Sequence, residues 1–328
     1  MRRREFIALL GSAAAVWPRS ARAQQTKNIP RLCFLTFDPE TSRSTRFGAF
    51  FEALHDLGYV DGQTIAIDYL SADGHGERFS ALAEKCVRLK ADIIAVSTTP
   101  ATQAAKEATH TIPIVMIALG DPVGTGLVDS LSRPGGNVTG MSMMVSELAV
   151  KRLELLKEAV PGISRVLVLS YLADPIAPLQ VKALKAAAPL LGVTLQIHDI
   201  KTAADLPAAF DAAAAEQADG VLTTAESLLV VQRALVNDLA IRHRLPSMHP
   251  YSIQVTDAGG LMAYDVDYPD LERRAAAYVD SILKGAKPSE LAVQQPTKIT
   301  LVINLKTAKA IGLTISESFL QRADQLIE

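Results

Sequence analysis

The chain contains few of the residues from which disulfide frameworks and metal centres are built. Only two of its 328 residues are cysteines, Cys33 and Cys86, so a framework of several disulfides is excluded. Cys33 falls in an apolar strand and Cys86 on a predicted helix, and both are predicted to be small buried side chains, although a bridge between them in an oxidising compartment stays open. The six histidines show no pairwise ligand spacing, and we expect neither a metal ion nor a cofactor.

Familiar catalytic motifs are also missing. The sequence has no G-x-S-x-G elbow, no phosphate-binding P-loop and no H-E-x-x-H zinc motif. The segment Gly124-Thr125-Gly126 begins like a dinucleotide-binding fingerprint, but Asp129 occupies the place of the third glycine. We therefore expect a binding protein rather than an enzyme.

The charge of the chain is nearly balanced, with a formal net value of −2, and offers no general attraction for nucleic acid. The N-terminus is the exception. Arg3 and Arg4 precede a short apolar run, and Ala21-Arg22-Ala23 forms a small-x-small cleavage site. This order predicts that residues 1–23 are a twin-arginine signal peptide that exports the folded protein to the periplasm. The alternative is an ordinary helix with basic residues at its start.

Strand-like apolar segments alternate with amphipathic helical segments along the rest of the chain. The run Val166 to Leu169 has the composition of a buried strand, whereas the segment from Phe47 to Leu57 places its apolar residues on one helical face. Two consecutive series of such strand-helix units predict an α/β fold with two doubly wound parallel-sheet lobes.

The residues after 260 are too few to bury a core of their own. We therefore expect the chain to return once to the first lobe and once to the second. The predicted first lobe comprises residues 29–140 and 261–291, and the predicted second lobe comprises residues 141–260 and 292–328. Three crossovers would then form a hinge beside an interlobe cleft.

In open parallel sheets, ligands bind beyond the carboxyl ends of the strands. The clearest candidates are Thr98 and Thr99, whose hydroxyls lie at a predicted helix start that would favour a ligand carboxylate. The alternative is a self-contained helix cap without a ligand. The same rule selects further candidate ligand-binding residues: Phe37, Gly120, Asp121, Tyr171, Asp174, Thr224, Glu226 and Ser227. Tyr251 and Tyr264 are weaker candidates, added because they lie near a predicted crossover.

Two acids in this set, Asp121 and Glu226, each have two possible roles. Asp121 either pairs with a ligand ammonium or hydroxyl, or bonds its own backbone in a turn. Glu226 either anchors a ligand amine or is a first-turn acid of the helix that Ser227 is expected to cap. If both acids face the ligand, a neutral or purely anionic ligand would leave them buried and unpaired, so a small zwitterion such as an amino acid fits best.

The three tyrosines among the candidates also have alternative roles. Tyr171 either closes over the ligand as a lid or is an exposed loop tyrosine. Tyr251 and Tyr264, near the third predicted crossover, are expected to be packing residues unless they reach the cleft.

Several longer motifs carry a family resemblance. The stretches 53–69, 93–142, 259–291 and 296–315, including "TTPATQAAK", "GDPVGTG" and "GGLMAYD", resemble ABC-transporter substrate-binding proteins of the tryptophan/tyrosine type. The resemblance covers almost the whole mature chain and implies the type I periplasmic-binding fold. One departure is Asp265, where glycine is expected in the hinge strand. Asp265 either contacts a ligand amine or caps the helix that follows.

The resemblance also implies a function. It predicts a monomeric carrier that captures a small molecule, an amino acid or an aromatic or other organic acid, outside the inner membrane. The carrier would deliver this ligand to an ABC permease with its ATPase. The alternative is an extracytoplasmic sensory ligand-binding protein, whose fold and cleft would be identical.

Overall fold

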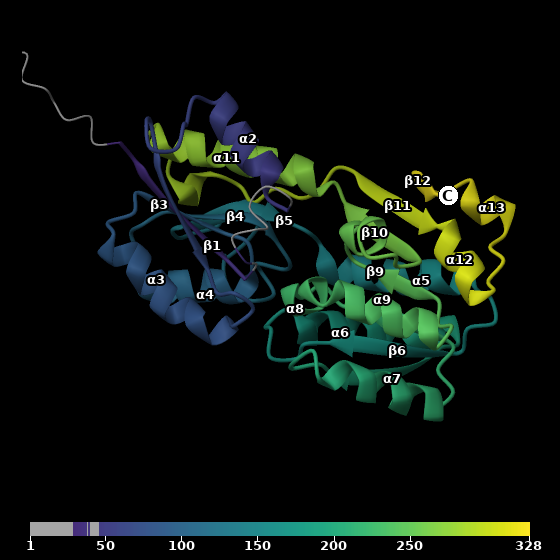
Figure 1. Ribbon diagram of the computed structural model, residues 1–328. Coiled ribbons are helices and arrows are strands. Elements are labelled where there is room, and N and C mark those ends of the chain that lie inside the picture. The colour runs from purple at the N-terminus through teal and green to yellow at the C-terminus, as the bar shows by residue number, and fades with distance from the viewer. Residues whose placement is uncertain (1–28, 38, 40–45) are drawn as a thin grey trace, which may run out of the picture.

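The computed structural model of the chain describes residues 29–37, 39 and 46–328. Strands and helices alternate along the chain and form two α/β lobes that lie side by side (Figure 1). The predicted two-lobe α/β architecture is therefore confirmed. The predicted signal peptide, residues 1–23, lies outside the described residues.

The first lobe is built on a five-stranded parallel sheet with the strand order β2-β1-β3-β4-β5. Side chains of β1 alternate between the two faces of this sheet, so both faces need a cover. Phe34 packs with residues of α2 and α11, whereas Leu35 packs with residues of α3 and α4. The elements of this lobe are β1 (Arg31–Thr36), α2 (Gly48–Asp56), β2 (Ala66–Ser71), α3 (Phe79–Arg88), β3 (Ile93–Val96), α4 (Thr99–Ala108), β4 (Ile114–Leu119), β5 (Val138–Ser142) and α11 (Tyr268–Leu283).

The second lobe has a seven-stranded sheet with the order β12-β11-β10-β9-β8-β6-β7. Helices again cover both faces, with α7 and α9 on one side and α5 and α6 on the other. The elements are α5 (Val145–Ala159), β6 (Arg165–Ser170), α6 (Ala177–Ala187), β7 (Thr194–Asp199), α7 (Asp205–Ala215), β8 (Gly220–Thr223), α8 (Ser227–Val231), α9 (Arg233–Arg242), β9 (Ser247–His249), α10 (Ile253–Thr256), β10 (Met262–Val266), β11 (Ile299–Asn304), α12 (Leu305–Ile311), α13 (Glu317–Leu320) and β12 (Gln325–Ile327).

One predicted lobe boundary differs from the structure. The strand after residue 260, β10, pairs with β9 and β11 in the second sheet and does not belong to the first lobe. The chain leaves this sheet only after Val266, where Asp267 caps α11 by accepting a hydrogen bond from the backbone N–H of Asp270 at 3.0 Å. The crossover therefore follows the strand instead of preceding it. The pairing of β10 with β11 is antiparallel, while the other strand pairs among the described residues are parallel.

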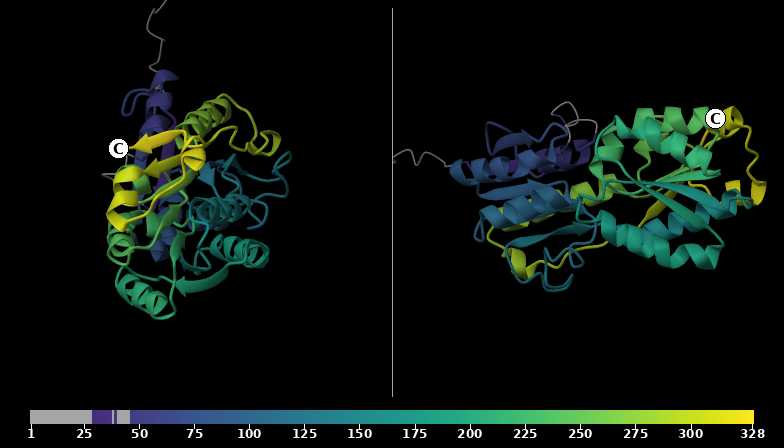
Figure 2. Two further views of the ribbon diagram at one scale, coloured as in Figure 1. Left: turned by 90° about the vertical axis from the view of Figure 1, so that its right-hand side faces the viewer. Right: turned by 90° about the horizontal axis from the view of Figure 1, so that it is seen from below.

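The crossover after Val266 is the second along the chain, and the first and third lie close to it. The chain passes from β5 to α5 between residues 142 and 145. It returns from the first lobe after Gln294, whose backbone N–H still bonds to the carbonyl of Gly140 at 3.0 Å, and enters β11 at Ile299. Three connections thus join two lobes that lie end to end when the molecule is viewed from below (Figure 2).

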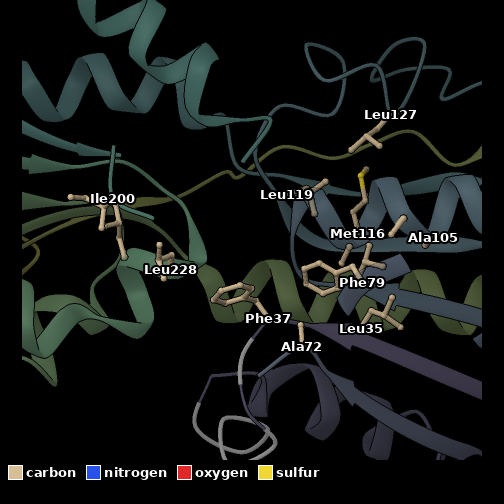
Figure 3. Close-up of a cluster of buried hydrophobic side chains, with 14 of the residues drawn as sticks. Leu35, Phe37, Ala72, Phe79, Ala105, Met116, Leu119, Leu127, Ile200 and Leu228 are labelled. Atoms are coloured by element: carbon tan, nitrogen blue, oxygen red, sulfur yellow. The ribbon is translucent and has the colours of Figure 1, made fainter. Parts of the chain in front are cut away.

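The lobes touch through an apolar contact at their facing edges. Phe37, after β1, lies between Phe79 of the first lobe and Leu228 of the second (Figure 3), and all three belong to one buried cluster. Cys33 and Cys86 are buried free thiols of the same cluster. None of the helices within the described ranges is long and apolar enough to cross a membrane.

Candidate functional site

Residues from the carboxyl ends of the strands of both sheets line a small cavity between the lobes, called here the cleft cavity. Its volume is about 20 Å³, which is room for roughly one water molecule. The first lobe contributes Thr98, Thr99 and Gly120, and the second contributes Asp174 and Ser227. Five residues selected by the strand-end rule therefore lie at one place, and Tyr251, a further predicted residue, lines the same cavity.

A second cavity, the aromatic cavity, adjoins the first and has a volume of about 160 Å³. Thr98, Asp174 and Ser227 line both cavities, so the two are neighbouring parts of one interlobe space. Phe37 and Tyr171, two further predicted residues, form aromatic walls of this second part. Tyr171 is partly buried in it, which argues against the reading as an exposed loop tyrosine.

Thr98 and Thr99 are placed by the start of α4. Thr98 is in an extended conformation, and its Oγ1 accepts a hydrogen bond from the backbone N–H of Ala101 at 3.2 Å. Pro100 follows in the first turn, where a missing N–H costs nothing. The helix cap predicted as the alternative therefore exists, and the same residues also face the cleft cavity. A ligand carboxylate there would lie at the positive end of α4.

Asp174 is the carboxylate of the cleft. It follows β6 in a loop, is 6% exposed, and its Oδ1 accepts a hydrogen bond from the backbone N–H of Ile176 at 3.1 Å. Burial raises the pKa of Asp174 to about 6, because the charged form loses water without gaining a cationic partner. A ligand ammonium would supply that partner.

Glu226 does not line the cleft but lies buried behind it, at 1% exposure. Its Oε1 accepts a hydrogen bond from Nε2 of Gln180 at 2.9 Å, and its Oε2 lies 2.5 Å from Oγ1 of Thr224. The single hydroxyl hydrogen of Thr224 also has the carbonyl of Leu169 at 3.0 Å, which can only accept. A protonated Glu226 satisfies both contacts by donating to Thr224, which in turn donates to Leu169.

The protonation of Glu226 also follows from its environment. Burial, and then the charge of Asp174, raise the pKa of Glu226 to about 8. Neither predicted role of Glu226 is therefore observed, because the side chain belongs to a buried network that holds the loops after β6 and β8 together. The expected cap by Ser227 is wrong as well, since Glu226 occupies the cap position of α8 and no side chain there accepts a capping bond.

Replacing Glu226 by glutamine tests this network. The pKa of this group rises from 4.5 in the unfolded chain to about 8 in the folded protein, so its contribution to stability is full below pH 4.5 and is lost as the pH rises to 8. Glutamine can keep the bonds to Gln180 and Thr224 without titrating, and only the long contact from the backbone N–H of Tyr171, 3.4 Å from Oε2, loses its acceptor. We expect Glu226→Gln to match the wild type at pH 5 and to exceed it at pH 9 by on the order of 3 kcal/mol in urea unfolding. A difference that does not change with pH would contradict this assignment.

Asp121 takes the turn role that was its alternative. Its Oδ1 accepts a hydrogen bond from the backbone N–H of Gly124 at 2.8 Å. It lines a groove beside the first crossover and neither the cleft cavity nor the aromatic cavity. The pattern Gly-Asp-Pro is typical of such a turn, so the sequence contained this signal.

Gly120 lies directly against the second lobe. A Cβ atom at this position would overlap Cδ1 of Ile176 and would lie 3.1 Å from Cγ2 of Val145, both in the second lobe. A side chain at position 120 would therefore have to displace the side chain of Ile176 in this arrangement of the lobes. The partner Ile176 was not among the predicted residues, because nothing in its local sequence distinguishes it from other buried apolar residues.

The two remaining tyrosines differ in position. Tyr251 lines the cleft cavity, and its hydroxyl donates to the carbonyl of Ala225 at 3.0 Å. Tyr264 lies between two apolar clusters, as predicted for a packing residue, and its carbonyl accepts a hydrogen bond from Nε of Arg152 at 2.9 Å.

Asp265 does not cap α11, because Asp267 does. Oδ2 of Asp265 instead accepts a hydrogen bond from the backbone N–H of Ser252 at 2.7 Å. Within the described part of the chain, no group of three or more His, Cys, Asp or Glu side chains is arranged to hold a metal ion.

Comparisons with known proteins agree with this arrangement. The sequence model of the family described as ABC transporter substrate binding protein matches residues 38–327. A tyrosine-binding protein of Clostridioides difficile (strain R20291) is 29% identical over 303 residues, which are 92% of this chain and 86% of the relative.

Two solved structures are also similar to this chain. The ABC domain of Streptococcus pneumonia in complex with L-Trp is 27% identical with a TM-score of 0.83, covering 91% of this chain and 99% of that one. A ligand-free, open substrate-binding protein with adhesive properties from Clostridium difficile is 26% identical with a TM-score of 0.65, at 91% and 99% coverage.

Proposed function

Because this chain belongs to the ABC transporter substrate-binding protein family, we propose that it binds an amino acid with an aromatic side chain between its lobes. The proposal includes export to the periplasm by the twin-arginine signal, action as a monomer and delivery of the ligand to an inner-membrane ABC permease with its ATPase. Arg3 and Arg4, followed by a small-x-small cleavage site, support the export route.

One observation carries the ligand class. Asp174 of the second lobe and the start of α4 in the first lobe, at Thr98 and Thr99, line the same buried cavity. The carboxylate offers a partner for an ammonium group, and the helix start offers one for a carboxylate. An α-amino acid carries both groups on one carbon atom, so its head group can contact both lobes at once.

The adjoining aromatic cavity supports an aromatic side chain. Phe37, Phe79 and Tyr171 line its walls, and the rings of Phe37 and Phe79 lie 6.5 Å apart. Aromatic rings favour edge-to-face and offset contacts with such walls. The relatives named for tyrosine and bound to L-Trp favour the same class of ligand.

The lobe arrangement supports capture by closure. A cleft cavity of about 20 Å³ is too small to admit an amino acid, so entry requires the lobes to separate. At nearly equal identity and coverage, the TM-score is 0.83 with the L-Trp complex and 0.65 with the open protein. This difference favours a closed arrangement in the present structure.

A panel of matched ligands tests the proposal by thermal unfolding. We expect L-tyrosine, L-tryptophan or L-phenylalanine to stabilise the mature protein by about 2.7 kcal/mol at 100 times Kd. Glycine lacks the side chain, and the corresponding arylpropionate lacks the ammonium group, so both should shift the melting temperature far less. Equal stabilisation by the arylpropionate would remove the ammonium site at Asp174, and no shift with any amino acid would reject the ligand class.

A further inference from the structure

The first crossover contains a residue whose backbone conformation its side chain disfavours. Met144 lies between β5 and α5 with a φ of 52° and a ψ of 41°, which is the left-handed region. This region brings Cβ too close to the following carbonyl oxygen and is costly for residues other than glycine, with asparagine and aspartate the most tolerant. A methionine there is strained and needs its surroundings to hold it in place.

The hydrogen bonds on either side of this residue belong to different lobes. The backbone N–H of Met143 donates to the carbonyl of Leu119, on β4 of the first lobe, at 2.6 Å. The carbonyl of Met144 already accepts from the backbone N–H of Leu148 at 3.0 Å, in the first turn of α5 in the second lobe. The chain thus changes lobes within two residues. Any rotation of the lobes at this crossover therefore has to change the backbone torsions of Met143 and Met144.

The crossover also forms one wall of the cleft. Met143 and Val145 line the cleft cavity, whereas Met144 between them lines the groove beside the first crossover. Val145 is one of the two side chains that a Cβ at Gly120 would meet, with its Cγ2 at 3.1 Å. A change in the torsions of Met144 would therefore move Val145 of the second lobe relative to Met143 and Gly120 of the first.

We propose that Met144 is a strained hinge residue, which takes the left-handed conformation when the lobes close and leaves it when they open. The strain at this residue then opposes closure, and the contacts made across the cleft offset it. Loss of the ligand removes part of these contacts, so the strain favours opening and release. The inference rests on the closing motion in the proposed function, but its first test needs no ligand.

A disulfide cross-link between the lobes measures the closed population without ligand. A Cβ at Gly120 would lie 2.7 Å from Cγ1 of Ile176, which is bonded to Cβ of Ile176, so the two Cβ atoms are no farther apart than the roughly 4.5 Å that a disulfide allows. In a protein with Gly120→Cys and Ile176→Cys, oxidised glutathione accepts the two electrons and two protons that the two thiols lose. The rate of cross-linking then follows the fraction of closed molecules. Cys33 and Cys86 are fully buried and stay out of this reaction.

Substitutions at position 144 of this double-cysteine protein test the hinge. Met144→Gly should cross-link about five- to tenfold faster than Met144→Ala, because glycine adopts the left-handed region freely and alanine keeps the penalty of a Cβ. Both lose the methionine side chain, so alanine is the matched control for that loss. Met144→Asn tolerates the left-handed region and should lie between them. Arg244→Gly replaces a residue with a φ of 54° inside the second lobe and should leave the rate unchanged.

Equal cross-linking rates for Met144→Gly and Met144→Ala would overturn the proposal, because the residue would then be left-handed in both arrangements of the lobes. The absence of a cross-link in every variant would also overturn it, because the lobes would then not meet at Gly120. Titration with L-tryptophan is the second measurement. The Kd of Met144→Gly should be lower than that of Met144→Ala by the same factor, and an equal Kd would contradict the proposal. If L-tryptophan binds neither variant while their cross-linking rates differ, the ligand class is rejected and the hinge assignment is supported.

Discussion

Asp174→Asn is expected to weaken binding of a zwitterionic amino acid by about 30-fold or more. Truncating one partner of a buried, hydrogen-bonded charge pair costs about 2–5 kcal/mol, and 1.4 kcal/mol corresponds to tenfold in Kd. Asparagine has nearly the same shape and can still accept the bond from Ile176, so the ligand-free protein should remain folded. Isothermal titration calorimetry with the ligand that gives the largest thermal shift measures the effect.

The control for this variant is Asp121→Asn. Asp121 is an acid of the same strand-end set, but its side chain is engaged with Gly124 outside the cleft cavity, so its replacement should leave the affinity unchanged. Equal losses in both variants would mean that Asp174 has no special role.

The pH dependence of binding provides an independent check on Asp174. Burial raises the pKa of this carboxyl to about 6 in the empty cleft, and only its ionised form pairs with an ammonium group. The affinity of the wild type should therefore fall by up to about tenfold per pH unit as the pH drops below 6. Asp174→Asn should show no such slope in the same range.

Gly120→Ala is expected to weaken ligand binding by about 10- to 100-fold while leaving the ligand-free protein folded. The added methyl group overlaps Cδ1 of Ile176, which belongs to the other lobe, so it opposes closure and not the folding of either lobe. Gly120 does not have a positive φ, so alanine causes no backbone strain there. Calorimetry measures the affinity, and small-angle scattering measures the compaction that accompanies closure.

A second substitution tests whether the clash with Ile176 causes the weaker ligand binding of Gly120→Ala. Ile176→Ala removes the atoms that the new methyl group would meet, so Gly120→Ala combined with Ile176→Ala should recover affinity relative to Gly120→Ala alone. Gly162→Ala is the matched control, because a Cβ at Gly162 meets no atom within 4 Å. If the double variant binds no better than Gly120→Ala, the contact between the lobes is not the cause of the loss.

A buried arginine, Arg152, holds the strand ends at the second crossover in place. Arg152 of α5 is fully buried and donates hydrogen bonds to the carbonyl of Tyr264 on β10 and, at 3.4 Å, to that of Pro250 after β9. It thus holds together the strand ends that lead into the second crossover. The same segment supplies Tyr251 to the cleft cavity.

Much of this protein could be predicted from the sequence because the relevant signals are local. The alternation of apolar strands and amphipathic helices determined the two-lobe α/β fold, since period and length distinguish these elements. The ends of the strands then located Thr98, Thr99, Asp174 and Ser227 at one cavity, because parallel strands place their carboxyl ends on the same edge.

Only the tertiary structure decided the features that depend on contacts between distant segments. Glu226 became a buried partner of Gln180 because α6 packs across the end of β8, and the two residues are 46 positions apart. The strand β10 joined the second sheet because its partners, β9 and β11, offer hydrogen bonds that no local pattern encodes. The contact of Gly120 with Ile176 arises from the angle at which the two lobes meet. That angle results from the packing of whole elements, and no short stretch of sequence specifies it.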